Sequence, residues 1–399
     1  MTSETQQQTS PSDVVIVGGA RTPYAKLAGA LASMTAVQLG SHAIRAAVER
    51  AGVAPGAVDA VLLGQVLQAG AGQNPARQAA LGAGLDPRVH ASAVNKVCLS
   101  GLTAVIDAAR MIRAGDAEVV VAGGMESMTH APHLLPGVRT GWLYGDRTAL
   151  DHLAHDGLTD AVDGGPMGAL TERGNADRGL TRDEQDAVAL ASHQRATAAR
   201  GVIAAEIAPV TIRSRKGDAI VDADEGVRAD TSAEGLATLR PAFSPDGTIT
   251  AGNASQLSDG AAALVLTSRA YAEQHGLAAM ATLDAAGQVA GPDNHLHSQP
   301  ARAISAALER AGWAVGDLDL VEINEAFAAV SVASTRELGL DPERVNIHGG
   351  AIALGHPIGS SGARLVLHAA YELARRDAGR AAVALCGGGG QGDALLLHR

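Results

Sequence analysis

The sequence is poor in aromatic residues and has only two cysteines. Phe, Trp and Tyr make up 2% of the 399 residues, although 46% of the chain is hydrophobic. The core must therefore be built from small aliphatic side chains and from the 48 glycines, which allow backbones to approach closely. Two cysteines without a CxxC pair exclude a disulfide-stapled secreted scaffold, and we expect a cytoplasmic protein in a reducing compartment.

Clustered positive charge and long hydrophobic runs are also lacking. Lys and Arg number 31 against 42 Asp and Glu, and this net charge of -11 argues against a nucleic-acid partner. No apolar run approaches the ~20 residues that span a bilayer, so we expect no membrane partner. Residues 1–12 have neither the basic nor the apolar segment of a signal peptide, and we expect a disordered extension there.

An internal repeat predicts the architecture. Residues 43–61 read AIRAAVERAGVAPGAVDAV, and residues 303–321 read AISAALERAGWAVGDLDLV, matched at a constant offset without a gap. Each copy has the pattern of an amphipathic helix that ends at a glycine, Gly52 or Gly312, before a turn and a strand. Two halves that each alternate strand and helix predict a duplicated α/β unit with largely parallel pairing inside each sheet.

The duplication also predicts domain boundaries. Residues 13–128 plus 258–278 would form an N-terminal half, and residues 279–399 a C-terminal half. Residues 129–257 between them are polar, glycine-rich and irregular, with a helix that starts at the capping box Thr181–Glu184. We interpret this middle segment as an inserted loop domain that covers the sheets.

The two cysteines lie in turns made of small residues. Cys98 precedes a helix predicted over about residues 99–113, and a thiol at a helix N-terminus is favoured in its thiolate form. Cys386 follows a strand and precedes Gly387–Gly390, after which another strand begins. These glycines favour a tight hairpin whose N–H groups could act as oxyanion donors.

Two histidines compete for the role of base. His356 lies in the Gly-His-Pro loop before a helix start, where a positioned imidazole could take a proton from a thiol. His348 lies a few residues upstream, and local sequence patterns do not separate the two. Metal binding is an alternative for the pairs His130/His133 and His152/His155, but no cysteine or carboxylate cluster accompanies them, so we expect no metal.

Eight further segments, taken in order, carry a specific pattern that covers essentially everything after residue 12. They are Gly19–Pro23, Asn95–Cys98, Gly123–Met128, Asn253–Ser255, Asp259–Ala262, Asn324–Phe327, Gly349–Pro357 and Cys386–Gly389. Jointly they resemble the thiolase family. The resemblance implies a duplicated thiolase fold in which two similar α/β halves stack in α-β-α-β-α layers, with an inserted loop domain.

The resemblance also implies roles for the candidate residues. Cys98 would be the nucleophile that accepts an acyl group, and His356 would activate it. Cys386 would be the acid/base that removes the α-proton of a second thioester. Asn324 would hold a water that forms one oxyanion hole together with His356. The N–H groups of Cys98 and Gly388 would form the second.

The substrates that the resemblance implies are coenzyme A, acetyl-CoA and acetoacetyl-CoA, with no permanently bound cofactor. Arg228 would lie beside the adenine of coenzyme A. The pantetheine tunnel would be lined by Met167, Phe243, Ser255, Leu257 and Phe327. The excursion over residues 128–160 carries Trp142, Tyr144 and two leucines outside the repeated core, and we expect it to tie dimers into a homotetramer.

The implied reaction is the reversible Claisen condensation of two acetyl-CoA to acetoacetyl-CoA and CoA, by a ping-pong route through acyl-Cys98. The alternatives are a broad-range 3-ketoacyl-CoA thiolase, a decarboxylating ketoacyl synthase, which needs no second cysteine, and a non-catalytic thiolase-like CoA-binding protein, which should lack a catalytic group. The chain departs from the family pattern at Leu99, Pro166, Gln256 and Ser258, next to the acyl pocket, so the resemblance leaves the chain-length preference open.

Overall fold

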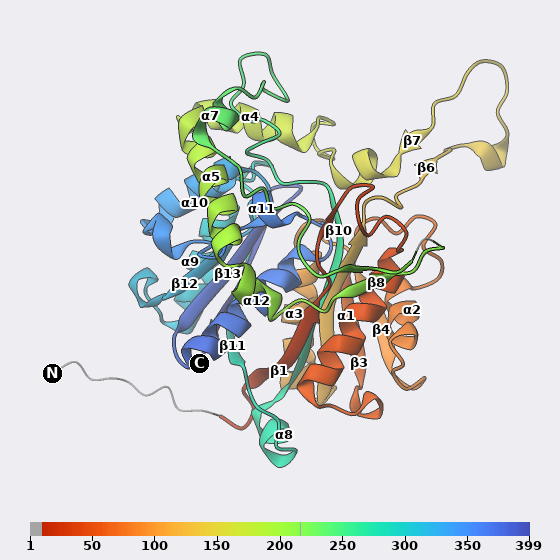
Figure 1. Ribbon diagram of the computed structural model, residues 1–399, viewed down its shortest axis with the longest axis vertical. Coiled ribbons are helices and arrows are strands. Elements are labelled where there is room, and N and C mark those ends of the chain that lie inside the picture. Colours follow the sequence, from red (N-terminus) through yellow and green to blue (C-terminus); the bar gives the residue numbers. More distant parts are fainter. Residues whose placement is uncertain (1–9, 216) are drawn as a thin grey trace.

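The computed structural model describes residues 10–215 and 217–399, and a ten-stranded sheet runs through it (Figure 1). Along the sheet the strands are β12 (Leu320–Ile323), β13 (Arg380–Gly387), β14 (Gln391–His398), β11 (Ala281–Ala290), β1 (Val14–Arg21), β10 (Ser258–Ser268), β5 (Val119–Ser127), β3 (Ala60–Gly64) and β4 (His90–Val94), with β2 (Ala25–Lys26) beside β10. Residues 1–9 of the expected extension lie outside the described part. The backbone of Ser10 and of Pro11 is hydrogen-bonded to Asp13 and to Ala270.

The sheet contains two copies of one strand arrangement. The order β1-β10-β5-β3 of the N-terminal half recurs as β11-β14-β13-β12 in the C-terminal half. The copies meet where β1 and β11 pair antiparallel, from Val14 opposite Leu283 to Ile16 opposite Ala281. The counterpart of β4 is reduced to a single bridge between Val321 and Val345. The duplication that the sequence repeat predicts is therefore confirmed.

The expected largely parallel pairing is wrong for the strands at the centre of the sheet. Among the strands of the described residues, only β3 with β4, β3 with β5, and β12 with β13 pair in parallel. The pairs β1–β10, β10–β5, β11–β14 and β13–β14 are antiparallel. The cause for β13 and β14 is their short glycine hairpin, because a direct hairpin can join only antiparallel strands. The strand β10 likewise returns antiparallel after the long insertion.

Helices and strands form the five expected layers. The helices α1 (Ala36–Ala51) and α2 (Pro75–Gly82) cover one outer face, and α9 (Gln299–Ala311) covers the other. The central helices α3 (Ser100–Ala114) and α12 (Ser361–Arg376) share one hydrophobic core with inward-facing side chains of both halves of the sheet. This middle layer is where the two halves meet.

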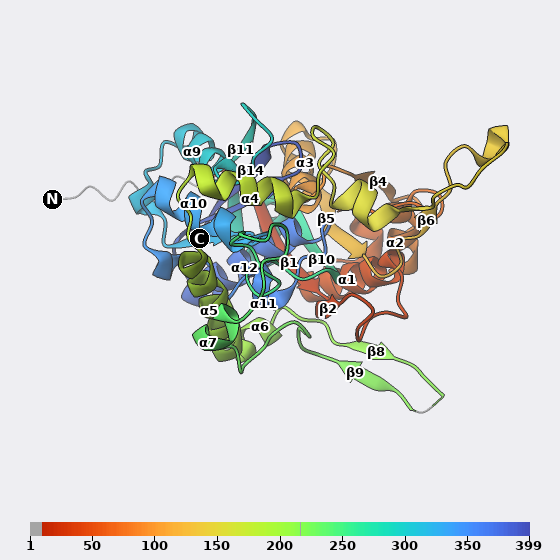
Figure 2. The ribbon, with the colours of Figure 1, turned by 90° about the horizontal axis from the view of Figure 1, so that it is seen from above.

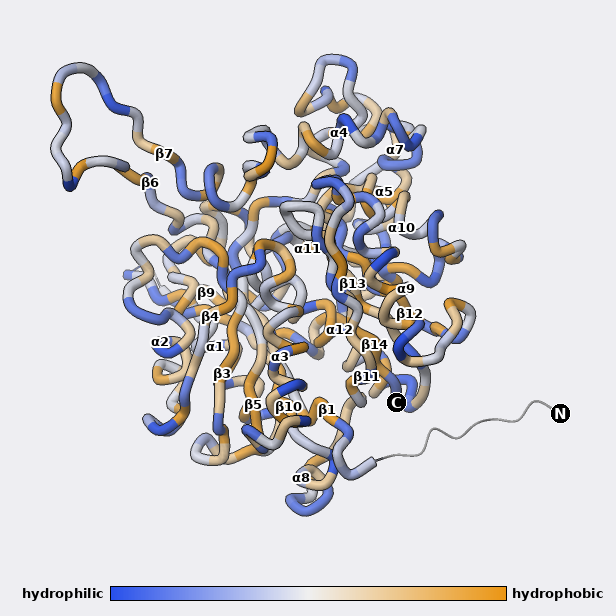
Figure 3. Tube along the Cα trace, turned by 180° about the vertical axis from the view of Figure 1, so that it is seen from behind, coloured by the Kyte–Doolittle hydropathy of each residue, from blue (hydrophilic) through white to orange (hydrophobic). Residues whose placement is uncertain are grey.

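The repeated helices end as the sequence predicts. Gly52 follows α1 with a φ of 66°, and Gly312 follows α9 with a φ of 67°, and each donates its N–H to a carbonyl of the last turn. Glycine reaches this left-handed conformation without steric cost. Figure 3 shows hydrophobic stretches along the central strands and hydrophilic ones in the outer loops.

The insertion contains helices, two hairpins and irregular segments. The helices are α4 (Met167–Asp177), α5 (Arg182–Ala198), α6 (Arg200–Ala204) and α7 (Ala233–Ala237), and the predicted capping box opens α5. The hairpins β6–β7 (His133–Leu134, Leu150–Asp151) and β8–β9 (Val210–Ile212, Ala219–Val221) lead into excursions that project from the layered body (Figure 2). At the tip of the first, Leu143 is 90% exposed and Tyr144 is 100% exposed.

Three further helices complete the fold. They are α8 (Arg269–Gln274), α10 (Ala328–Leu338) and α11 (Ala351–Leu354). The helix α10 follows the segment that carries Asn324, and α11 precedes His356 directly. None of the helices in the described ranges is long and apolar enough to cross a membrane.

Candidate active site

A strained turn between β4 and α3 presents Cys98. Val97 has a φ of 50°, which is rare for a β-branched residue and is retained only where the surroundings enforce it. Its N–H donates to Asn95 Oδ1 at 3.1 Å, and Ser100 Oγ donates to its carbonyl at 2.6 Å. Lys96 forms an ion pair of 2.7 Å with the buried carboxylate of Asp393. These contacts hold the thiol at the N-terminus of α3.

The thiol of Cys98 is not a resting thiolate. Burial of its sulfur raises the pKa of Cys98 to about 11, the N–H groups of Cys98 and Gly388 lower it in part, and the Glu126 carboxylate raises it further. The backbone N–H groups thus favour the thiolate, in the direction that the sequence predicts, but the loss of hydration outweighs them. Cys98 is protonated at pH 7 and needs a base.

His356 is buried and oriented by Ser361. The imidazole Nδ1 lies 2.6 Å from Ser361 Oγ, which donates its own proton to the Pro357 carbonyl at 3.0 Å. Both bonds form together only if Nδ1 carries the imidazole proton, which leaves Nε2 as a proton acceptor. Asn324 Nδ2 lies 3.5 Å from that Nε2. Burial lowers the pKa of His356 to about 4, with Arg364 adding to the effect, so the ring is neutral at pH 7.

Cys386 ends β13 beside the Cys98 turn. The predicted glycine hairpin is confirmed, since Gly387 pairs with Gln391 and the two glycines between Gly388 and Gln391 have positive φ. A side chain at Gly387 would collide with Leu99, so the hairpin packs directly against the residue that follows Cys98. Burial raises the pKa of the Cys386 thiol, and the nearby Cys98 raises it further. Both cysteines are free thiols.

A cavity of about 490 Å³ opens beside His356. Its wall includes all five residues that the resemblance assigns to a pantetheine tunnel, Met167, Phe243, Ser255, Leu257 and Phe327. The rings of Phe243 and Phe327 meet edge to face with centroids 6.2 Å apart. Pro166 and Gln256 also line the cavity, whereas Leu99 and Ser258 lie outside its wall as the structure describes it. A mostly apolar wall of this kind suits a slender, flexible chain.

Arg228 and His348 lie elsewhere, and neither is among the described residues that line the cavity. The backbone N–H of Arg228 donates to His193 Nδ1 at 3.2 Å, and its guanidinium lies 3.0 Å from His193 Nε2. His348 contacts His368 at 3.1 Å, and His368 pairs with Glu206 at 3.0 Å. His348 therefore belongs to a buried ionic network, which leaves His356 as the imidazole at the cavity.

Two contributors to the site were missed at the level of sequence. Ser361, which orients His356, was seen only as a helix start, although its spacing of five residues from His356 was visible. Glu126, which acts on Cys98, was seen only as part of the segment Gly123–Met128. No local pattern indicates that its carboxylate is buried beside a thiol that lies 28 positions earlier in the chain.

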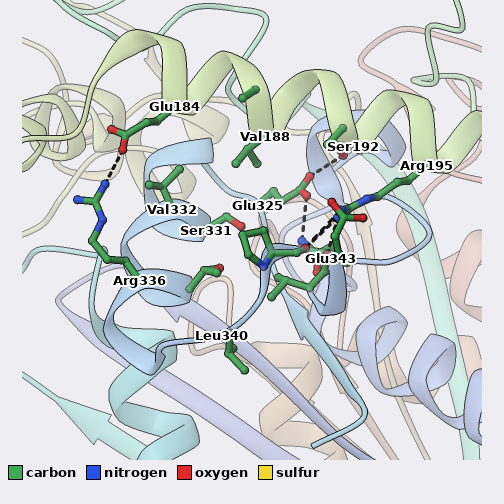
Figure 4. A pocket seen from close by; sticks show the side chains of 16 residues that line it. Glu184, Val188, Ser192, Arg195, Glu325, Ser331, Val332, Arg336, Leu340 and Glu343 are labelled. Atoms are coloured by element: carbon green, nitrogen blue, oxygen red, sulfur yellow. Dashed lines mark hydrogen bonds and ion pairs between the residues drawn. The ribbon is translucent and has the colours of Figure 1, made fainter. Parts of the chain in front are cut away.

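A second cavity of about 460 Å³ lies between α5 and α10 (Figure 4). Ion pairs flank it, Glu184 with Arg336 at 2.6 Å and Arg195 with Glu343 at 2.9 Å. The Glu325 carboxylate accepts hydrogen bonds there from Ser192 Oγ at 2.7 Å and Asn346 Nδ2 at 2.9 Å. Among the residues described, neither cysteine nor His356 lines this cavity. These hydrogen bonds of Glu325 hold the segment that carries the neighbouring Asn324.

Comparisons with known proteins agree with this geometry. Residues 14–270 match the family model for the thiolase N-terminal domain, and residues 277–399 match the model for the thiolase C-terminal domain. The chain belongs to the thiolase family. The family boundary near residue 270 lies close to the start of the C-terminal half that the repeat indicates.

Relatives of this thiolase are similar along nearly their full length. It is 59% identical to a probable acetyl-CoA acetyltransferase of Mycolicibacterium smegmatis, over 96% of this chain and 100% of the relative. It is 51% identical to an acetyl-CoA acetyltransferase of Pseudomonas aeruginosa, over 97% and 99% of the two chains. The crystal structure of the Bacillus anthracis acetyl-CoA acetyltransferase superposes with a TM-score of 0.94 at 41% identity, covering 97% of this chain and 98% of that one. The α/β thiolase fold is thereby confirmed.

If His356 accepts the proton of Cys98, as the resemblance implies, the neutral resting forms of the two groups predict an unusual pH profile for the alkylation of Cys98 by iodoacetamide. Between the pKa of His356, about 4, and that of Cys98, about 11, proton transfer within the pair needs no proton from solvent, so the rate should be nearly flat. The rate should fall as the pH drops through the His356 pKa, because the protonated ring cannot accept the thiol proton. With His356→Ala the rate should instead rise about tenfold per pH unit. A wild-type rate that climbs steeply from pH 6 to 8 would contradict the pair. Peptide mapping identifies the alkylated cysteine.

Proposed function

We propose that this thiolase is an acetyl-CoA acetyltransferase that condenses two acetyl-CoA reversibly to acetoacetyl-CoA and CoA by a ping-pong route. The observation that carries the proposal is the cavity lined by the five tunnel residues and by the neutral His356, whose Nε2 lies 3.5 Å from the Asn324 amide. The similarity to acetyl-CoA acetyltransferases over nearly whole chains supports it. The thioester supplies both the leaving group and the acidity, so no permanently bound cofactor is needed.

In the first half-reaction, Cys98 takes the acetyl group. His356 Nε2 accepts the thiol proton as the sulfur attacks the thioester carbonyl. The negative charge on that oxygen would be stabilised by the N–H groups of Cys98 and Gly388, which already face the Cys98 sulfur. Cys386, whose raised pKa keeps it protonated, gives its proton to the departing CoA thiolate.

In the second half-reaction, Cys386 is a thiolate and can act as a base. It removes a methyl proton from a second acetyl-CoA in the tunnel. The enolate oxygen would be held by the protonated His356 Nε2 and by a water bound to Asn324. The carbanion attacks the acetyl carbon on Cys98, and the Cys98 sulfur leaves and recovers its proton from His356. Both cysteines and the histidine thus return to their neutral starting forms.

The proposal also concerns parts of the chain away from the reacting groups. Arg228, half-buried and adjacent to His193, would receive the adenine end of coenzyme A. We assign residues 13–128 plus 258–278 and 279–399 to the catalytic halves, and residues 129–257 to the inserted domain that binds coenzyme A. Two free thiols of this reactivity suit a reducing compartment, and we place the enzyme in the cytoplasm.

Replacement of Cys386 by serine should separate the two half-reactions. The Cys386→Ser variant should still transfer radiolabelled acetyl to Cys98, although more slowly, because the first nucleophile and its base are intact and only the acid that protonates the departing CoA thiolate is weakened. It should lose condensation by about 10²–10⁴-fold, since a serine hydroxyl is a far weaker base than a thiolate. Peptide mapping locates the label, and a coupled assay follows condensation. Label on residue 386 of the wild-type enzyme alone, or wild-type condensation by the variant, would refute the mechanism.

Thiolysis rates against acyl length test the substrate class. Acetoacetyl-CoA should have a higher kcat/KM than 3-ketohexadecanoyl-CoA, because bulky side chains such as Leu99 and Met128 surround the Cys98 region. Apolar pockets discriminate by only about 1–3 kcal/mol per methylene, so slightly longer or branched substrates should react measurably. The reverse preference would favour a broad-range 3-ketoacyl-CoA thiolase, and no turnover with any chain length would favour a non-catalytic CoA-binding protein.

The excursion over residues 128–160 should tie dimers into a homotetramer. Its tip exposes Trp142, Leu143 and Tyr144, which a lone subunit leaves open to water. Light scattering at micromolar concentration should give the mass of four chains of 40.2 kDa. Leu143→Asp together with Tyr144→Asp should reduce it to a dimer, whereas Leu81→Asp, on a helix of the body, should not. A wild-type dimer would reject the tetramer.

A further inference from the structure

Gly359 is one of the points at which the loop that carries His356 contacts the N-terminal half. Gly359 belongs to the C-terminal half, but its surroundings are almost entirely from the N-terminal half. A side chain added at Gly124 would lie 2.0 Å from the Gly359 carbonyl oxygen, one at Gly64 2.5 Å, and one at Gly101 2.8 Å. These three glycines come from β5, β3 and the first turn of α3. They form a notch into which the Gly359 peptide group fits.

The carboxylate of Glu126 closes this notch. Glu126 is fully buried on β5, and its Oε2 accepts the Gly359 N–H at 3.0 Å and the Val66 N–H at 2.9 Å. Its Oε1 accepts the Leu67 N–H at 3.1 Å. A Cβ at Gly359 would come within 2.9 Å of this carboxylate. The close approach of the two residues therefore requires glycine at this position. One carboxylate thus joins the end of β3 to the loop three residues after His356.

We propose that Glu126 is a positioning residue for catalysis, which sets the distance of the His356 imidazole from Cys98 by anchoring Gly359 in the notch of Gly64, Gly101 and Gly124. The inference rests on the proposed function, because it concerns the base of that reaction. It goes further by naming the group that fixes the position of the His356 loop, in the C-terminal half, relative to the N-terminal half. Burying an ionised carboxylate is costly, and the three N–H donors at this one point offset that cost.

The charge of Glu126 also affects Cys98, and this effect should change the reaction rate in the opposite direction to the positioning of His356. The negative charge of Glu126 raises the pKa of Cys98, so its removal makes the thiol more acidic. The buried Asp259 also acts on Glu126, Cys98 acts on Cys386, and Arg364 acts on His356. If Glu126 acted through its charge alone, neutralising it would therefore speed the reactions of Cys98. If it positions His356, neutralising it must slow them.

A double-mutant cycle on the alkylation of Cys98 by iodoacetamide separates these effects. The rate is measured at pH 8, above the pKa of about 7 to which burial raises Glu126, in four proteins: wild type, E126Q, H356A and the double variant. E126Q should slow the wild type about 10–10²-fold, as a misplaced base does. In H356A the same change should not slow the reaction and should speed it slightly, because only the charge effect remains. Equal slowing in both backgrounds, or no slowing in the wild type, would overturn the proposal.

Two further variants make the test independent of folding defects. Asp259→Asn neutralises a buried carboxylate on the neighbouring strand that binds Thr129 at 3.0 Å instead of the His356 loop, so it should leave the alkylation rate unchanged. Gly359→Ala keeps the Glu126 charge and displaces the loop, so it should slow alkylation only when His356 is present. If E126Q does not fold, Gly359→Ala decides the outcome. Because iodoacetamide is not a thioester, the result holds even if the enzyme's natural substrate is not acetyl-CoA.

Discussion

Close backbone contact between the two central helices is the constraint on which the site depends. A side chain at Gly362, in the first turn of α12, would lie 2.4 Å from the Leu102 nitrogen, and one at Gly101, in the first turn of α3, would lie 2.9 Å from the Ala363 nitrogen. The two helix N-termini therefore cross at glycines. Cys98 precedes one of them and His356 precedes the other, so this crossing brings together the turns that carry the proposed nucleophile and the proposed base.

Desolvation at that crossing decides the chemistry. Cys386 and His356 are buried and Cys98 is partly buried, and this loss of hydration raises the pKa of both cysteines and lowers that of His356. All three groups thus start uncharged, and in the proposed mechanism charge appears only as a proton moves between them. Fixed N–H groups that face the Cys98 sulfur then stabilise the charge without reorganisation, which is the usual source of large rate effects in enzymes.

The sequence predicted those features that arise from local or repeated patterns. The repeat at residues 43–61 and 303–321 predicted the duplication, because each copy must bury the same helix face against the same kind of strand. The glycine run after Cys386 predicted a hairpin, since it leads into a strand and not a helix. The pairing of the central strands was predicted wrongly, because strand direction depends on which segments return to the sheet and not on the alternation of helix and strand.

The residue types of the site follow from the sequence alone, but which of them contact one another, and in which protonation state, does not. Cys98, Cys386, His356 and Asn324 could all be named from motifs, and the fold could be assigned from the family resemblance. Tertiary structure alone decided that His348 joins an ionic network with His368 and Glu206 while His356 meets the cavity. It also decided that Cys98 rests as a thiol and that Glu126 holds Gly359. The reason is that desolvation and backbone contact across the two halves depend on atoms hundreds of residues apart, which no local pattern encodes.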